Sequence, residues 1–239
     1  MIEIKNLTKR FGTLLAVDNL SFSVSEGEVL GFLGPNGAGK STTMKMLTGF
    51  LGASSGSISI CGLDIANESL AAKKIMGYLP EGAPCYGDMS VESFLEFIAD
   101  IRQIPAANKK QVIADVVKKI ELQSVLGQSI DTLSKGFKRR VGLAQAILHD
   151  PKVLILDEPT DGLDPNQKHQ VRQLIKNLAK DKIVIISTHI LEEVTAVCTR
   201  AIIINHGKLI IDDTPAGLAS RTPTGKLDDV FRTLTGVAA

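Results

Sequence analysis

The chain has 239 residues, of which 44% are hydrophobic and 22% are charged, a composition typical of a folded globular protein. Its 27 basic and 26 acidic residues give a net charge of +1, so we expect no nucleic-acid partner. Three separated cysteines, Cys61, Cys85 and Cys198, favour packing roles in a reducing compartment over disulfides or metal ligands. The apolar runs are far shorter than the about 20 residues of a spanning helix, and no signal peptide is visible. We therefore expect that the chain does not cross a membrane.

Short strands dominate residues 1–83. Apolar patterning predicts strands at Ile2–Lys5, Ser21–Val24, Glu28–Leu33, Ser57–Ile60 and Met76–Leu79. Helical patterns predict one helix at Lys40–Thr48, which Gly49 ends, and another near Glu68–Lys74.

Residues 84–150 show a different pattern, with no period-two alternation. Apolar residues recur there at helical spacing, in the three sets Val91, Leu95, Ile98; Val112, Val116, Ile120; and Val141, Ala144, Leu148. This block is expected to be mostly helical and to form its own subdomain.

Alternation returns after residue 150. Strands are predicted at Val153–Leu156, Ile183–Ser187 and Ala201–Ile204, with helices at Gln167–Leu178 and Leu191–Val197 between them. Strands that alternate with helices in short units imply a mostly parallel sheet with flanking helices. A turn at Asn205–Lys208 leads into a last strand, and Thr214-Pro215 is a favourable helix start.

A glycine-rich segment joins the strand Glu28–Leu33 to the helix that begins near Lys40. Gly34-Pro35-Asn36-Gly37-Ala38-Gly39-Lys40-Ser41 matches the pattern G-x-x-x-x-G-K-[ST]. Backbone N–H groups in such a loop turn toward one anion, and the helix N-terminus adds positive potential. We expect Lys40 to reach the β- and γ-phosphates of a nucleotide, Ser41 to ligate Mg²⁺, and Thr42 to contact a neighbouring phosphate. A chance glycine-rich turn is the alternative.

Two adjacent carboxylates, Asp157 and Glu158, follow the apolar strand Val153–Leu156. Ligands of open α/β sheets bind at the carboxyl ends of the strands, so these side chains are expected beside the glycine-rich loop. Asp157 is the expected Mg²⁺ ligand, directly or through water, and Glu158 is the expected group that polarises the attacking water.

The segment Leu133–Arg140, Leu-Ser-Lys-Gly-Phe-Lys-Arg-Arg, separates the chain from most proteins with those two motifs. Ser134 is a favourable N-cap, and a helix N-terminus is a ready anion site. The segment resembles the signature motif of ATP-binding cassette (ABC) ATPases, most often L-S-G-G-Q. Asp157–Pro165 and Ser187-Thr188-His189 follow in the family's order, and the resemblance extends to about Asp212.

The resemblance implies a fold class: an α/β protein with a P-loop NTPase core, an N-terminal antiparallel β portion and an inserted α-helical subdomain. Residues 1–239 would form one ABC ATPase domain. Residues 1–83 and 151–212 would make the core with its β subdomain, residues 84–150 the helical subdomain, and residues 213–239 a short C-terminal helical tail. In that tail, Leu227, Phe231 and Leu234 form an apolar stripe suited to docking on the body or on a partner.

The resemblance also implies the remaining site residues and a homodimer. Each ATP would lie between the glycine-rich loop of one copy and Ser134 and Gly136 of a second copy. His189 would contact the γ-phosphate and hold Glu158 and water in line, and Phe11 would stack on adenine, with core packing as its alternative. His149, His169 and His206 are interpreted as surface or packing residues.

Four positions depart from the commonest family pattern. Glu81 replaces a glutamine that senses Mg²⁺ and the attacking water, and Asp161 replaces a frequent serine. Lys135 and Phe137 replace the glycine and the glutamine of the commonest signature, while Ser134 and Gly136 remain. Glu81 can still ligate Mg²⁺, so we keep it as a metal and catalytic candidate. Glu81, Lys135 and Asp161 together resemble the ABC-2 type exporter ATPases, including a gliding-motility-like subset.

The resemblance therefore predicts a motor subunit that is cytoplasmic, peripheral on the inner face of the cell membrane, and partnered with a separately encoded permease. Tyr86, Met89, Phe94 and Phe97 lie where the family receives the permease, although the subdomain's own core explains most of them. One alternative is a soluble ABC ATPase that acts in assembly or in nucleic-acid processes. Another is an unrelated P-loop kinase or GTPase, which would leave residues 134–140 unexplained.

Overall fold

The computed structural model describes residues 1–236. A six-stranded sheet is its centre, with the order β10-β9-β3-β8-β7-β6. Its strands are β3 (Val29–Leu33), β6 (Met76–Leu79), β7 (Val153–Asp157), β8 (Ile183–Thr188), β9 (Arg200–Asn205) and β10 (Lys208–Asp213). The strands from β9 to β6 pair in parallel, and β10 pairs antiparallel with β9. The carboxyl ends of β3, β6, β7 and β8 therefore meet at one edge of the sheet.

A second, antiparallel sheet has the order β2-β1-β4-β5. Its strands are β1 (Ile2–Phe11), β2 (Leu14–Val24), β4 (Ser55–Ile60) and β5 (Leu63–Asp64). The predicted strands Ile2–Lys5 and Ser21–Val24 were too short, because irregularities in the β1–β2 pairing break the period-two pattern after Ile4. These breaks hide strand residues from a search for alternation.

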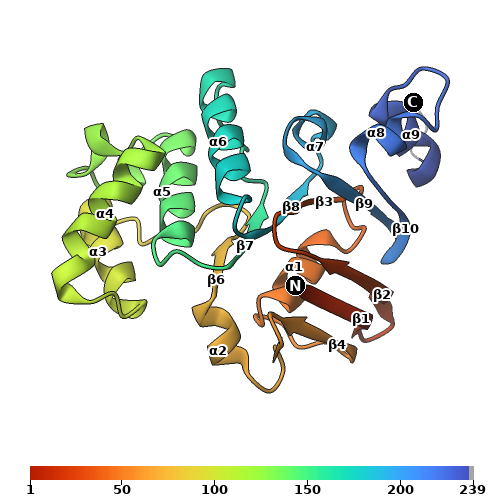
Figure 1. Cartoon of the computed structure of the whole chain (residues 1–239), viewed down its shortest axis with the longest axis horizontal. Coiled ribbons are helices and arrows are strands. Elements are labelled where there is room, and N and C mark those ends of the chain that lie inside the picture. The colour runs from red at the N-terminus through yellow and green to blue at the C-terminus, as the bar shows by residue number, and fades with distance from the viewer. Residues whose placement is uncertain (237–239) are drawn as a thin grey trace.

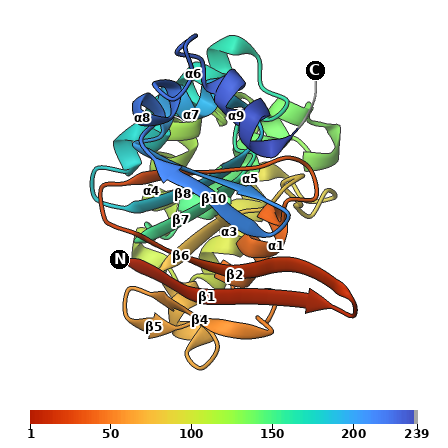
Figure 2. The same cartoon turned by 90° about the vertical axis from the view of Figure 1, so that its right-hand side faces the viewer.

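Opposite faces of the six-stranded sheet support different layers (Figure 2). On β7, Val153 and Ile155 belong to a core shared with the four-stranded sheet and with α1 (Lys40–Leu47), which lies between the two sheets. Leu154 and Leu156 belong to a second core, which includes α5 (Lys135–Ile147) and α6 (Pro165–Leu178). This alternation is expected of a strand that is buried on both faces.

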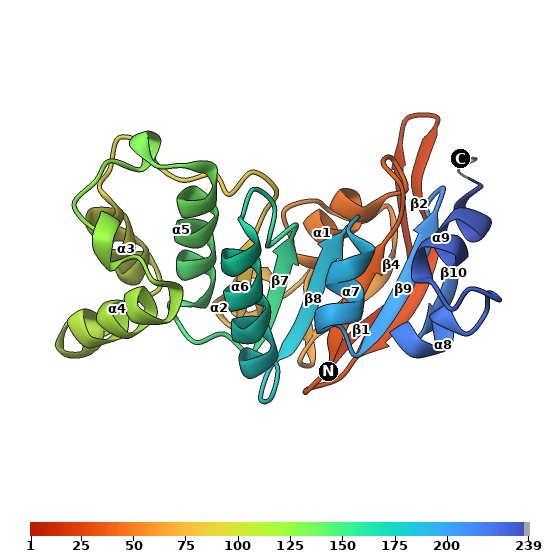
Figure 3. The ribbon, with the colours of Figure 1, turned by 90° about the horizontal axis from the view of Figure 1, so that it is seen from above.

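The helices of residues 84–150 form one end of the molecule (Figures 1 and 3). They are α3 (Val91–Ile101), α4 (Ala106–Ile120) and α5 (Lys135–Ile147), with 3₁₀ turns at Gln123–Val125 and Ile130–Thr132. The three predicted sets of apolar residues lie on these helices, apart from Leu148, which follows the end of α5. α5 packs against both α4 and β6, so it joins the helical group to the sheet.

The remaining helices are α2 (Ser69–Lys74), α7 (Leu191–Val197), α8 (Pro215–Ala219) and α9 (Leu227–Thr235). The apolar stripe of α9 packs on the body, because Leu227, Phe231 and Leu234 join a core that contains Leu33 and Val194. The last three residues of the predicted tail, 237–239, lie outside the described residues. No helix within residues 1–236 has both the length and the apolar character that a membrane crossing requires.

Candidate nucleotide site

The glycine-rich loop follows β3 and leads directly into α1. Gly37 and Gly39 have φ values of +79° and +105°, which L-residues with side chains rarely adopt. A Cβ on Gly39 would lie 2.5 Å from the Ala16 carbonyl oxygen, and one on Gly34 would lie 2.6 Å from the Ile204 carbonyl oxygen. Gly39 is the N-cap of α1 and offers no capping side chain. The first amides of α1 are thus available to an anion.

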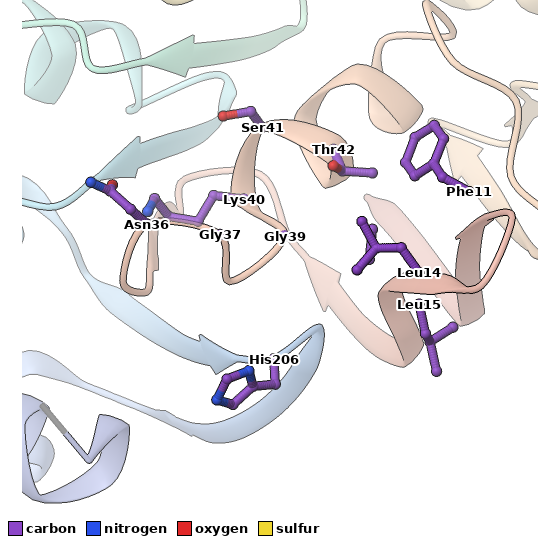
Figure 4. Close-up of a pocket in the computed structure, with 11 residues that line it drawn as sticks. Phe11, Leu14, Leu15, Asn36, Gly37, Gly39, Lys40, Ser41, Thr42 and His206 are labelled. Carbon is purple, nitrogen blue, oxygen red and sulfur yellow. The ribbon is translucent and has the colours of Figure 1, made fainter.

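A cavity of about 370 Å³ opens beside this loop (Figure 4). Its lining consists of Phe11, Leu14, Leu15, Ala16, Asn36, Gly37, Gly39, Lys40, Ser41, Thr42 and His206. Apolar Phe11, Leu14 and Leu15 lie at one end, and Asn36 and Lys40 lie at the other. The cavity therefore suits a ligand with a flat apolar part and an anionic part.

Phe11 is the last residue of β1 and is 47% exposed, so it is not a core residue. Its ring also receives a cation–π contact from Lys9, whose Nζ lies 5.1 Å from the ring centroid. Leu14 is 63% exposed, and an exposed aliphatic side chain beside an exposed ring is typical of a binding surface. Sequence reasoning missed Leu14, Leu15 and His206, because strand pairing and the β9–β10 turn bring them to the loop.

Lys40 folds back on the glycine-rich loop. Its Nζ donates to the carbonyl oxygens of Gly34, at 2.6 Å, and of Pro35, at 3.1 Å. Burial lowers the pKa of Lys40, and the carboxylates of Glu158, Asp157 and Glu81 oppose that shift. All three predicted acidic residues thus lie within electrostatic reach of the loop lysine.

Asp157 ends β7, where it pairs in register with Ser187 of β8. Its side chain is almost fully buried, and burial raises the pKa of Asp157; the nearby Ser187 hydroxyl and Lys40 oppose that shift, and Glu81 and Glu158 add to it. The buried Ser187 Oγ is close enough to Asp157 to affect its pKa, but it makes no hydrogen bond of acceptable geometry with any residue of 1–236. This corner has polar oxygen atoms that a bound cation and its waters can satisfy.

Glu158 has the left-handed φ of +50°, which turns its side chain toward the end of β8. Its carboxylate accepts hydrogen bonds from Thr188 Oγ1 at 3.1 Å and from the His189 backbone N–H at 3.1 Å. His189 Nδ1 lies 2.7 Å from the same carboxylate. The structure thus brings together the predicted Glu158–His189 pair and adds Thr188, to which we had assigned no role.

Ser134 caps α5, as the sequence predicts: its Oγ accepts a hydrogen bond from the Phe137 backbone N–H at 3.3 Å. Ser134 is exposed, whereas Gly136 is buried against Gln167, whose Oε1 would lie 2.9 Å from an added Cβ. Neither residue is among those described as lining the cavity. The second predicted anion site is therefore separate from the first within one chain.

The residues present fit a magnesium ion that is held mainly by a ligand. Within residues 1–236, no group of three or more His, Cys, Asp or Glu side chains is arranged to hold a metal ion unaided. Mg²⁺ in nucleotide sites takes only one or two protein oxygens, with phosphates and water completing its shell. Ser41, Asp157 and Glu81 offer oxygens of that kind.

The site has a glycine-rich loop with its lysine between a buried strand and a helix, and it has two carboxylates, Asp157 and Glu158, at the end of β7. These features define a P-loop nucleotide-binding protein. Comparison with known proteins narrows this class. Residues 17–161 match the model of the family described as ABC transporter. The uncharacterized ABC transporter ATP-binding protein YhcH of Bacillus subtilis is 42% identical over 212 residues, which are 88% of this chain and 68% of that protein.

A second relative and a solved structure point to the same family. The Nod factor export ATP-binding protein I of Burkholderia orbicola is 37% identical over 218 residues, covering 91% of this chain and 72% of that protein. A solved structure of an ATP binding subunit of an ABC transporter has a TM-score of 0.89 at 27% identity, covering 98% of this chain and 99% of the other. The chain belongs to the ABC transporter family. It is the ATP-binding, ATP-hydrolysing component of such a transporter, and the predicted α/β fold class is confirmed.

Proposed function

We propose that two copies of this chain bind two ATP molecules between them and drive a separate permease in the membrane. One observation carries the proposal: the chain has two anion-binding features that do not meet within one copy. The cavity beside Lys40 is lined without α5, and the exposed Ser134 caps α5 outside it. Head-to-tail pairing of two copies gives the Ser134 site a phosphate to bind and closes the cavity.

In the proposed complex, the residues of 34–42 bind the phosphates. The loop amides and Lys40 contact the β- and γ-phosphates, Ser41 and Asp157 would hold Mg²⁺, and the bound ion would neutralise phosphate charge. Glu81 is the third proposed ligand of Mg²⁺. Phe11 stacks on the adenine, and the partner copy presents its own Ser134 and Gly136 to the γ-phosphate.

Glu158 is the proposed acceptor of the proton from the attacking water. The support is geometric: three hydrogen bonds from Thr188 and His189 hold its carboxylate at the end of β8. His189 is 61% exposed and can turn toward a phosphate while its backbone N–H still holds Glu158. A general base contributes about 10²–10⁴-fold to such a rate.

The proposed permease site lies where α3 meets the six-stranded sheet. Two cavities, of about 320 and 480 Å³, share Tyr78 and Arg102 there. Exposed Phe50 borders the first, and exposed Tyr86 borders the second and packs edge-on against Phe97 at a centroid distance of 5.5 Å. Phe94 is buried in the core, as our alternative explanation expected, and its ring also lines the second cavity. Exposed aromatic side chains around a groove are typical of protein-binding sites.

With such a partner, the chain is peripheral on the cytoplasmic face of the membrane. Export as the direction of transport follows from the resemblance of Glu81, Lys135 and Asp161 to the ABC-2 type exporters, and the relative from Burkholderia orbicola has an export name. We therefore propose an ABC-2 type exporter subunit.

Mixing two inactive variants tests the shared site. Ser134→Arg blocks the α5 site and Lys40→Ala disables the phosphate loop, so each variant alone is expected to be inactive. Mixed copies form one hybrid site that has an intact loop and an intact Ser134, and ATPase activity should return in part. Activity that stays absent at every mixing ratio, although both variants remain folded, would contradict a site shared between copies.

A second experiment tests the membrane partner. Tyr86→Asp places a charge in the apolar groove and should abolish recovery of a multi-span membrane protein with the tagged chain. The matched control is Ile210→Asp on β10, because Ile210 is also an exposed apolar side chain, at 41%, and lies outside the groove. Equal recovery with both variants would place the partner elsewhere.

A further inference from the structure

Arg139 is a buried cation on α5 that contacts three segments of the nucleotide site. Its side chain is only 3% exposed. Nη1 donates to the carbonyl oxygens of Pro80, at 3.1 Å, and Asp157, at 3.3 Å, and Nη2 lies 3.7 Å from Asp161 Oδ2. The guanidinium thus connects α5 with the residue before Glu81, with the end of β7, and with the loop after Glu158.

Asp161 has a second cationic partner on the same helix. Lys135 Nζ lies 2.9 Å from Asp161 Oδ2, and the Lys135 side chain runs over Gly162, where an added Cβ would lie 2.7 Å from Lys135 Cδ. Lys135 is exposed, whereas Arg139 is buried. Two cations from one helix therefore hold a single carboxylate of the loop.

That carboxylate belongs to the turn that begins at Glu158. The Asp161 backbone N–H donates to the Glu158 carbonyl oxygen at 3.1 Å, and Glu158 itself has the left-handed φ of +50°. A non-glycine residue in this region is strained and persists only where its surroundings hold it. The contacts of Asp161 with Lys135 and Arg139 connect the far end of this turn to α5, in addition to the packing of buried Thr160 and Leu163.

The charges around the site show why a cation is needed there. Asp161, Asp157, Glu158 and Glu81 are four carboxylates that all act electrostatically on Arg139. Four negative groups at close range repel each other and a nucleotide. Arg139 lies within electrostatic reach of all four and stays charged when buried, because a guanidinium does not lose its proton in proteins.

We propose that Arg139 is a positioning residue for ATP hydrolysis, which acts by holding Asp161 and, through the Glu158–Asp161 turn, the carboxylate of Glu158. Arg139 contacts no nucleotide in this scheme. The inference rests on the proposed role of Glu158 as the proton acceptor. It differs from a purely structural role, since it predicts a loss of turnover rather than of ATP binding.

Three variants and one control test it, with steady-state ATPase rates, a fluorescent ATP analogue for binding, and thermal unfolding as readouts. Arg139→Met should lower kcat about 10–100-fold, the size expected when a reacting group is misplaced by about 1 Å, and should leave KM within about threefold. Arg139→Lys keeps the charge and should recover much of the loss. Asp161→Asn changes a half-exposed side chain, so it should fold normally and also lower kcat.

Lys182→Met is the matched control. Lys182 is also a buried cation, but it pairs with Asp150 at 2.7 Å and precedes β8, at the opposite end of that strand from Thr188 and His189. Its loss should lower the unfolding temperature while kcat stays near the wild-type value. The double variant Arg139→Met/Asp161→Asn should be no slower than the slower single variant, since both changes break one connection.

The inference fails if Arg139→Met turns over at the wild-type rate, if Lys182→Met is slowed as much, or if the two single losses multiply in the double variant. Glu158→Gln separates this failure from that of the proposed function. A Glu158→Gln variant with normal turnover refutes the role of Glu158. A Glu158→Gln variant that is inactive beside a fully active Arg139→Met variant refutes only the role of Arg139.

Discussion

Replacing Glu158 by glutamine removes one negative charge and almost no volume. The side chain is only 12% exposed and receives hydrogen bonds from Thr188 Oγ1, from the His189 backbone N–H and from His189 Nδ1. A glutamine carbonyl oxygen can still accept from the His189 N–H, so the fold should persist. The amide cannot take a proton from water. We expect kcat to fall about 10²–10⁴-fold, which corresponds to about 3–5 kcal/mol of activation free energy.

Nucleotide binding should survive this change. Glu158 is not among the residues that line the cavity, and its negative charge acts on Lys40. Removing its charge lowers the repulsion that a γ-phosphate meets, so affinity for ATP should stay equal or rise. The opposite result, weak binding with normal turnover of the bound fraction, would assign Glu158 to binding instead of chemistry.

Two assays measure the outcome: phosphate release under steady state and equilibrium binding of a fluorescent ATP analogue. Glu3→Gln is the control, because Glu3 is a carboxylate of β1 that pairs with the exposed Lys5. It should leave both quantities unchanged. Phosphate release by Glu158→Gln at the wild-type rate would refute the reasoning from geometry to proton transfer.

Three further changes probe the loop, the interior and the tail. Gly39→Ala puts a Cβ 2.5 Å from a backbone oxygen at a φ of +105°, so ATP binding should weaken by about tenfold or more, whereas Gly52→Ala, which meets no atom within 4 Å, should bind normally in the same titration. Burial lowers the pKa of His149 from 6.5 to about 4, so the free energy of unfolding should be highest above pH 6.5 and fall as the pH drops toward 4. In urea unfolding, His149→Gln should show a shallower fall of this free energy with pH, and identical pH dependences would contradict the prediction. Leu227→Ala should remove about 2–5 kcal/mol of local packing and expose the segment after Asp213 to proteases. Limited proteolysis checks this prediction, and an unchanged digestion pattern would contradict it.

Sequence patterns predicted the bounds of those helices and strands whose side-chain pattern is regular. The strand Met76–Leu79 and the helix Leu191–Val197 have the predicted bounds, and α5 begins after the predicted cap at Ser134. β1 and β2 are longer than predicted, because their irregular pairing shifts side chains out of strict alternation. Where the pattern is broken by partners on another strand, only the paired structure gives the bounds.

The phosphate loop could also be predicted from the local sequence. Its consecutive residues carry the whole geometry, because glycine φ values and the start of α1 are local properties. The sequence also determined the order of strands and helices, the alternation of buried faces, and the presence of a second helix N-terminus at Ser134. These features depend on neighbours three or four residues away.

Contacts between distant residues were decided only by the tertiary structure. Thr188 reaches Glu158 because β7 and β8 are adjacent in the sheet, and His206 reaches the cavity through the turn between β9 and β10. Arg139 contacts Pro80, Asp157 and Asp161 because α5 packs on β6, which pairs with β7 in the sheet. A sequence pattern records which groups a segment has, but packing determines which groups from other segments lie within hydrogen-bonding distance.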